Sequence, residues 1–403
     1  MKKIQLHWQI LIALILGIIY GLTFPDYVQY VSWMGDLFLR GLKMVIVPLI
    51  LSSIISGVAN IGNAGSLGRL SLKTFTYYIT TSLLAIMTGL FFVNILQPGV
   101  GADLGNMQQI EGLEASKNSI SETILNIIPT NIFSAFSEGQ MLSIIFFALL
   151  FGFFITRVEN KYQTLMTDFS NAVFEVMMKI TMFIIKFTPL GILGIVAKQV
   201  ATTSNLSNVA SSLGIYMLAV LFGLAVHGGF TLPLLLKTIG KVNPLKHFKA
   251  MTTPLLTAFS TSSSNATLPL TMEAVEHNAG VSNKITSFTL PLGATVNMDG
   301  TALYECVAAV FMAQAYGHSL TIVEQAIIVV TALLASIGAA GIPMAGLVMI
   351  SIILTAIGLP LELIGLILAV DRPLDMCRTT INVWSDMCGA VIIAKSEGET
   401  LKV

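Results

Sequence analysis

The chain has 403 residues, of which 55% are hydrophobic and only 10% are charged. A soluble domain usually carries about a quarter charged residues, so this chain has too few polar groups to cover a surface that faces water. Its formal net charge of zero offers no basic excess for a nucleic acid, and its three cysteines lack the spacing of a zinc site or a disulfide framework.

Six apolar segments in the first part of the chain are each expected to cross a membrane. A membrane helix needs about 20 mostly apolar residues. The six segments run roughly over 6–24, 44–59, 75–96, 127–155, 174–197 and 213–236. The first follows two lysines, as a signal peptide would, but no cleavage pattern follows it, so we expect it to remain as a helix.

Basic residues alternate between the loops that connect these segments. Lysine and arginine concentrate in cytoplasmic loops of membrane proteins. One side collects Lys2, Lys3, Arg69, Lys73, Arg157, Lys161, Lys237, Lys241, Lys246 and Lys249. The opposite loops are acidic or rich in Ser and Asn, and Arg40 and Lys43 are the exception. The pattern predicts six crossings with a cytoplasmic N-terminus.

After Lys249 the apolar pattern is broken by polar clusters at 260–265, 297–300 and 336–343. Non-helical backbone at membrane depth survives only inside protein or beside a water-filled cavity, and paired broken segments indicate a transporter's binding site. We therefore predict two re-entrant hairpins, around Ser263 and Gly341, each followed by a spanning helix. The two units are expected to form an inverted repeat.

The last predicted helix, from about Leu361, carries a polar stripe. Asp371, Asp375, Arg378, Asn382 and Asp386 are spaced by four, three, four and four. At about 100° per residue they fall within an arc of roughly 80°. The alternative is a soluble amphipathic helix, but the apolar flanks 363–370 and 389–394 favour a membrane helix. A charge at its centre costs about 2.5–3.5 kcal/mol, which predicts a functional site.

The chemistry of the stripe predicts its ligands. Arg378 suits bidentate binding of a carboxylate, and Asp375 suits an ammonium group. The two side chains would also pair with each other when no ligand is present. Together with Asp299, the stripe has a formal charge of about −3, so an acidic amino acid would need cations to enter with it. Carboxylate, hydroxyl and carbonyl oxygens suit sodium. His227, in the sixth segment, is interpreted as a packing residue.

Four motifs resemble the glutamate transporter family, the dicarboxylate/amino acid:cation (sodium:dicarboxylate) symporters. They are Ser262-Ser-Ser-Asn-Ala-Thr-Leu-Pro-Leu-Thr-Met272, Leu292-Gly-Ala-Thr-Val-Asn-Met-Asp-Gly-Thr301, Ala340-Gly-Ile-Pro343 and the stripe of the last helix. The resemblance covers nearly the whole chain. It implies an all-α membrane protein with eight transmembrane helices, two re-entrant hairpins and inverted repeats, working as a homotrimeric elevator.

The resemblance also implies a division of the chain. Residues 1–72 would hold scaffold helices 1 and 2, 73–118 transport-domain helix 3, 119–203 scaffold helices 4 and 5, 204–249 transport-domain helix 6, and 250–403 the transport core. The protein would lie in the inner cell membrane with both termini cytoplasmic. Sodium is the implied coupling ion, with no prosthetic group, and no enzyme motif is present.

Carried over residue by residue, the family's pattern implies substrate and sodium sites. The substrate residues would be Ser264, Thr301, Ile342, Gly346, Asp375, Arg378, Thr379 and Asn382. One sodium site would use Asp386 with carbonyls of Gly293, Asn297 and Asn382. A second would use Thr295 with carbonyls near Ser336, Ile337 and Ala339. A third would use Asp299 and Asn297 with Tyr78, Thr81 and Ser82.

Branches of the family that carry different substrates differ at positions that can be compared with this chain. Carriers of neutral amino acids tend to lack the arginine matched by Arg378, and carriers of C4-dicarboxylates tend to lack the aspartate matched by Asp375. Both are present, which favours aspartate or glutamate. Glu305 replaces a glutamine of archaeal carriers, so it is either a proton carrier or a carboxyl satisfied by a hydroxyl. Arg372 is considered as a substitute for an archaeal arginine at the position of Ser262.

Other functions remain open at this point. A proton-coupled carrier, or a carrier of neutral amino acids or dicarboxylates, would share the same fold. An anion-conducting channel or a membrane receptor would also use polar membrane segments. Coupled accumulation of a solute distinguishes a transporter from both.

Overall fold

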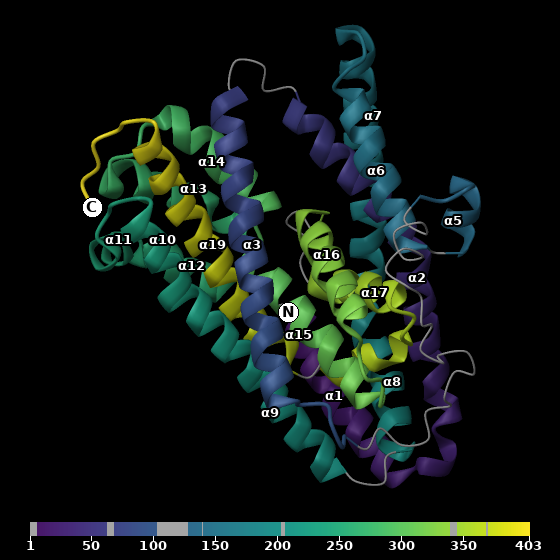
Figure 1. Cartoon of the computed structure of the whole chain (residues 1–403). Helices are drawn as coiled ribbons and strands as arrows, with labels where there is room; N and C mark the ends of the chain where they lie inside the picture. The colour runs from purple at the N-terminus through teal and green to yellow at the C-terminus, as the bar shows by residue number, and fades with distance from the viewer. Residues whose placement is uncertain are drawn as a thin grey trace, which may run out of the picture.

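The computed structural model describes residues 6–62, 68–102, 128–138, 140–202, 206–338, 345–367 and 370–403. Within these ranges every regular element is a helix (Figure 1). The predicted all-helical class is therefore confirmed for the part of the chain that can be described.

In the first half of the chain most of the described residues lie in helices. They are α1 (Leu6–Thr23), η1 (Pro25–Tyr27), α2 (Gln29–Gly62), α3 (Gly68–Leu96), α5 (Ile132–Glu138), α6 (Met141–Ile155), α7 (Asn160–Ile185), α8 (Thr188–Thr202), α9 (Leu206–Val226), the π-helix η2 (His227–Thr231) and α10 (Leu232–Thr238). The second predicted segment was too short, because α2 begins at Gln29 and includes Arg40 and Lys43.

The fifth predicted segment, 174–197, is not one continuous helix. It crosses the junction of α7 and α8, where the axis bends by 52°. Pro189 causes the break, because proline has no backbone N–H and disfavours the helical conformation of the residue before it. In the fourth predicted segment, α5 ends at Glu138 and α6 begins at Met141.

The second half contains the expected broken elements. They are α11 (Pro244–Ala250), α12 (Thr252–Thr261), α13 (Ser264–Ala274), the π-helix η3 (Val275–Ala279), α14 (Asn283–Val296), α15 (Asp299–Ala315), α16 (Ile322–Gly338), α17 (Ala345–Ala356), η4 (Leu361–Leu363), α18 (Ile364–Ile367) and α19 (Asp371–Ser396). The α12–α13 hairpin turns at Ser262, which has φ of +51°, and Ser263 then caps α13 by accepting a hydrogen bond from the Ala266 N–H at 3.2 Å.

The last helix begins later than the sequence suggested. Rather than one helix from Leu361, the chain forms η4 and α18, and α19 starts at Asp371. Pro373 lies in the first turn of α19, where its missing N–H would have no partner in any case. It therefore causes no kink within the helix.

Two packed groups of helices are visible in Figure 1, joined by the α16–α17 pair. In one group α2 packs against α6, α7 and α8, and α1 packs along α8. In the other, α15 contacts α3, α9 and α19, while α12 and α14 contact α19. The side chains of α15 are almost all buried, so this helix lies at the centre of the second group.

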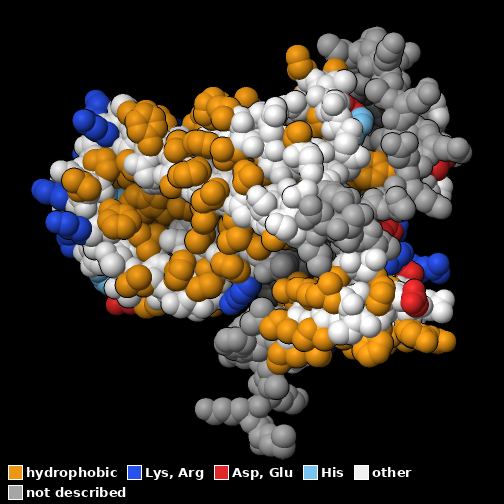
Figure 2. Space-filling view, turned by 90° about the horizontal axis from the view of Figure 1, so that it is seen from below, with side chains coloured by type: hydrophobic (Ala, Val, Ile, Leu, Met, Phe, Trp, Pro, Cys, Tyr) orange, Lys and Arg blue, Asp and Glu red, His pale blue; other side chains and the backbone are white. Residues whose placement is uncertain are grey.

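The surface of the described residues is strongly apolar, as a bilayer requires. Figure 2 shows hydrophobic side chains over wide areas of one face. Three described helices are long and apolar enough to cross a membrane: Gln29–Ala59, Arg69–Leu96 and Ser207–Thr238. A fourth is reached if the bent α7–α8 pair counts as one span. The expected total of eight stays a prediction.

Candidate functional site

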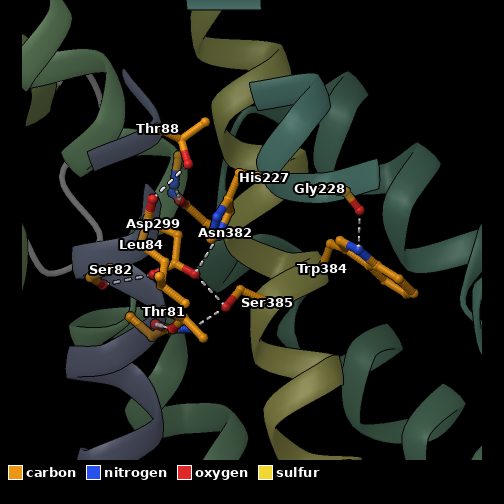
Figure 3. A network of polar contacts seen from close by, with 12 residues as sticks. Thr81, Ser82, Leu84, Thr88, His227, Gly228, Asp299, Asn382, Trp384 and Ser385 are labelled. Atoms are coloured by element: carbon orange, nitrogen blue, oxygen red, sulfur yellow. Dashed lines mark hydrogen bonds and ion pairs between the residues drawn. The ribbon is translucent and has the colours of Figure 1, made fainter. Parts of the chain in front are cut away.

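The site forms where α19 meets the break between α14 and α15. Asn297 and Met298 leave the helical conformation there, and α15 starts at Asp299. This break directs backbone and side-chain polar groups of α14 and α15 toward α19, with α3 and η2 close by (Figure 3). Four segments that are far apart in sequence thus supply one polar cluster.

Asp299 is the most enclosed carboxylate of the cluster, with no exposed surface. One oxygen accepts a hydrogen bond from Ser82 at 2.7 Å, and the other accepts one from Ser385 at 2.6 Å. The second oxygen also lies 3.0 Å from Nε2 of His227 (Figure 3). Since a buried carboxylate is costly unless its oxygens have partners, these contacts allow it to stay here.

Two members of this cluster were missed from the sequence. His227 is not a packing residue, because its ring contacts Asp299 directly. One sign of this role was present in the sequence, namely a histidine followed by two glycines in an otherwise apolar helix. In the structure a π-helix begins at this histidine. Ser385 was missed because its side chain carries no charge. At about 100° per residue it falls only some 20° outside the predicted polar arc.

Asn297 connects Asp299 to the second buried carboxylate, Asp386, which is 3% exposed. Its side-chain amide donates to Oδ1 of Asp386 at 2.9 Å and to the hydroxyl of Ser385 at 3.0 Å. Its Oδ1 lies 3.4 Å from the Thr81 hydroxyl, which is oriented to donate to it. The residues expected at the first and third sodium sites are therefore brought together, except that the Tyr78 hydroxyl donates to the carbonyl of Thr289 at 2.7 Å.

The backbone at Gly293 comes close to this cluster. A methyl group added at Gly293 would lie 2.4 Å from Oδ1 of Asp386 and 2.7 Å from the Tyr78 hydroxyl. No side chain fits at this position without moving the carboxylate. Gly293 thus keeps its backbone within reach of Asp386, as the predicted sodium site requires.

Arg378 lies in the middle of the stripe and is 2% exposed. Its Nε donates to Asp375 at 2.9 Å, and its Nη1 forms an ion pair with Asp371 at 3.2 Å. The guanidinium carbon lies 4.2 Å from the centre of the Tyr304 ring, and the Tyr304 hydroxyl donates to Asp371 at 2.7 Å. Asp371 and Tyr304 therefore position Arg378, a role that was not assigned from the sequence.

Arg378 and Asp375 pair with each other in this structure. Arg372 contacts the other oxygen of Asp375 at 3.4 Å, and its side chain is 43% exposed. It lies at the edge of the predicted substrate residues. Gly346, in the first turn of α17, covers Arg378 closely, because an added methyl group would lie 2.6 Å from its Nη1.

Asn382 holds the start of α15 against α19. Its Oδ1 accepts from the backbone N–H groups of Gly300 at 2.7 Å and Thr301 at 3.3 Å. Its amide group donates to the Thr301 hydroxyl at 3.0 Å. Thr379, one turn earlier, is also buried. The predicted substrate residues Thr301, Thr379 and Asn382 are therefore adjacent to Arg378.

The structure gives less information about the other predicted site residues. Ser264 is half-buried at the start of α13. Thr295 and Ser336, of the second predicted sodium site, donate to carbonyls of their own helices at 2.9 and 2.8 Å. The side chain of Ile337 is outside the described part of the structure, and so are Ala339 and Ile342 entirely.

Glu305 lies one helical turn beyond Thr301 on α15 and has no exposed surface. Neither of its carboxyl oxygens has a hydrogen-bond partner among the described residues. The alternative that a hydroxyl of the helix satisfies this carboxyl is therefore wrong for the structure described. A buried carboxyl without partners is most stable in its protonated form.

The donors of the site are oxygens of carboxylates, hydroxyls, amides and opened backbone. This set fits a hard cation such as sodium. Among the described residues no group of three or more His, Cys, Asp and Glu side chains could hold another kind of metal ion. The sodium sites predicted around Asp386 and Asp299 therefore have suitable ligands, whereas the second one is only partly described.

A buried charged site lined by oxygen atoms and enclosed by helices with an apolar surface is typical of a membrane transporter. The profile of the sodium:dicarboxylate symporter family matches residues 6–396. The chain belongs to this family, which confirms the resemblance and the expectation that it is not an enzyme.

Curated relatives cover nearly the whole chain. The chain is 36% identical to the proton/sodium-glutamate symport protein of Geobacillus stearothermophilus, over 99% of this chain and 96% of that protein. It is 36% identical to the excitatory amino acid transporter 3 of Oryctolagus cuniculus, over 98% and 87%. It is 34% identical to the proton/glutamate-aspartate symporter of Escherichia coli K12, over 98% and 93%.

Proposed function

We propose that this protein imports an acidic amino acid, aspartate or glutamate, together with sodium. The observation that carries the proposal is the buried Arg378, held between Asp371 and Asp375 over the ring of Tyr304. A substrate carboxylate would form a bidentate pair with the guanidinium, with both oxygens accepting hydrogen bonds. Asp375 would then turn from Arg378 to the substrate ammonium. The names of the relatives, which include glutamate and aspartate, agree with this substrate class.

Sodium is the proposed coupling ion because the site cannot accept another negative charge alone. The carboxylates of Asp299, Asp371, Asp375 and Asp386 outnumber Arg378, the one buried lysine or arginine among the described residues. Burying a substrate with a net charge of −1 beside them would be prohibitive without cations. Asp386 and Asn297, with carbonyls of Gly293 and Asn382, would bind one ion. Asp299, with the hydroxyls of α3, would bind another.

Alternating access would follow the pattern of the family. The proposed assembly is a homotrimer with eight membrane helices and two re-entrant hairpins in each chain. Residues 73–118, 204–249 and 250–403 would move as a transport domain against the scaffold, 1–72 and 119–203. The basic loops would lie in the cytoplasm with both termini, and the membrane would be the bacterial inner membrane.

Glu305 is the proposed carrier of a proton that accompanies sodium. Its burial near Arg378 and its lack of hydrogen-bond partners support this role. Two of the relatives named above are described as proton-coupled or proton/sodium-coupled symporters. The alternative, a carrier driven by protons alone, would make sodium dispensable.

Uptake of radiolabelled L-aspartate and L-glutamate into proteoliposomes tests the proposal. We expect accumulation with an inward sodium gradient, little with choline, and loss of it in Arg378→Ala but not in Arg40→Ala, an exposed arginine of α2. Calorimetric binding of sodium by Arg378→Ala would show that this variant still folds. Uptake of serine or succinate instead would overturn the substrate class. Anion currents without accumulation would favour a channel.

A further inference from the structure

A groove opens on the side of α19 that faces away from the charged cluster. Its volume is about 830 Å³, and it lies between η2, α10, α11 and α19. Pro233, Phe248 and Trp384 provide apolar walls, and Lys237 and Lys241 lie at its margin. This volume is in the range of binding sites for small molecules. The proposed substrate and sodium sites use none of these residues.

Contacts of Trp384 hold the floor of the groove together, and the centre of the groove is open. The indole N–H of Trp384 donates to the carbonyl of Gly228 at 3.0 Å, and the Trp384 ring stacks on His247 with centroids 5.2 Å apart. Gly229, the next residue of the π-helix, has free space on its side-chain face, because an added methyl group would meet no atom within 4 Å. The groove is therefore preformed around Trp384.

The charge of the groove is positive. Lys237 and Lys241 are exposed, and the groove-lining residues include no aspartate or glutamate. Neither lysine forms an ion pair within the described part of the chain. They belong to the basic loop that the alternation of charge places at the cytoplasmic surface of the membrane. Figure 2 shows basic side chains gathered at one edge of the molecule, next to hydrophobic ones.

The apolar walls continue into side chains suited to the bilayer. Phe230 on η2 is 64% exposed, and Leu234 on α10 is also exposed. A ligand of this groove therefore needs an apolar chain and an anionic head at the depth of the membrane surface. We propose that the groove binds one anionic phospholipid, with its phosphate at Lys237 and Lys241 and an acyl chain along Phe248 and Trp384.

This lipid would contact the elements that hold the charged site. Trp384 precedes Ser385, which donates to Asp299, and Gly228 follows His227, which contacts the same carboxylate. The lipid would therefore favour the arrangement of α19 and η2 seen here. We expect faster uptake in membranes that contain anionic lipid.

Quenching of Trp384 fluorescence by brominated lipid tests the binding directly. In a Trp8→Phe/Trp33→Phe background Trp384 is the only remaining tryptophan. The protein is reconstituted in phosphatidylcholine vesicles that contain brominated phosphatidylglycerol or, in parallel, brominated phosphatidylcholine. We expect stronger quenching by the anionic lipid. Each lysine near a membrane surface contributes roughly a fivefold preference, so Lys237→Gln/Lys241→Gln should lower the selectivity about 25-fold.

Two further variants separate this site from general attraction to the membrane. Lys246→Gln/Lys249→Gln removes the same charge from α11 outside the groove and should keep the selectivity. Gly229→Leu fills the groove and should weaken quenching by both lipids. Equal quenching by the two lipids, or equal effects of the two lysine pairs, would overturn the proposal, as would no quenching at all. No substrate takes part, so this result is independent of the proposed transport function.

Discussion

Replacing Gly293 by alanine should weaken sodium binding without changing any charge. The added methyl group would lie 2.4 Å from Oδ1 of Asp386 and 2.7 Å from the Tyr78 hydroxyl. These contacts are far below van der Waals separation, so the carboxylate must move from the amide of Asn297, which now donates to it at 2.9 Å. A lost hydrogen bond to a charged group costs about 1.5–3 kcal/mol.

The sodium concentration for half-maximal aspartate uptake should therefore rise roughly 10- to 150-fold, since each 1.4 kcal/mol is a factor of ten. Uptake into proteoliposomes at graded external sodium measures it. Alanine also favours helix over glycine by about 0.5–1 kcal/mol, so a control must share that gain. Gly214→Ala on α9 does so, because its methyl group would meet no atom within 4 Å.

Gly346→Ala provides the complementary test. Its methyl group would lie 2.6 Å from Nη1 of Arg378, so it should mainly raise the KM for the amino acid. Gly293→Ala should mainly change the sodium dependence. The reasoning is refuted if Gly293→Ala responds to sodium as Gly214→Ala does, or if both site variants shift the two dependences equally.

Three further substitutions test other parts of the site and fold. Arg378→Lys should raise the KM for an acidic amino acid at least about tenfold, because lysine cannot bind a carboxylate in bidentate fashion. An unchanged KM in uptake assays would contradict this. Glu305→Gln should flatten the pH dependence of uptake, and a pH profile identical to that of the wild type would remove the proton-carrier role. Thr321→Ala should lower stability by about 1 kcal/mol, because its hydroxyl accepts from the Glu324 N–H at 3.2 Å and caps α16. Thr321→Ser should retain this stability in thermal unfolding, and equal melting of the two variants would argue against the cap.

The polar stripe of α19 could be predicted because it depends on local geometry. A helix repeats every 3.6 residues, so spacing alone places Asp375, Arg378, Asn382 and Asp386 on one face. The existence of breaks in the helices could also be predicted, since Gly, Pro and polar clusters interrupt apolar helices. Their positions were less so: the start of the last helix was placed about ten residues early, at Leu361 rather than Asp371.

The sequence by itself determined the class of protein and the polar face of α19, and it predicted the chemical type of the ligands. Only the tertiary structure decided which side chains complete the site. His227 reaches Asp299 across 72 residues, and Tyr304 holds Asp371 across 67. Such contacts depend on how helices pack against one another, and the periodicity within a single segment cannot predict that packing. For the same reason the closeness of Gly293 to Asp386, and the groove beside Trp384, became visible only once α14, α10 and α19 were placed side by side.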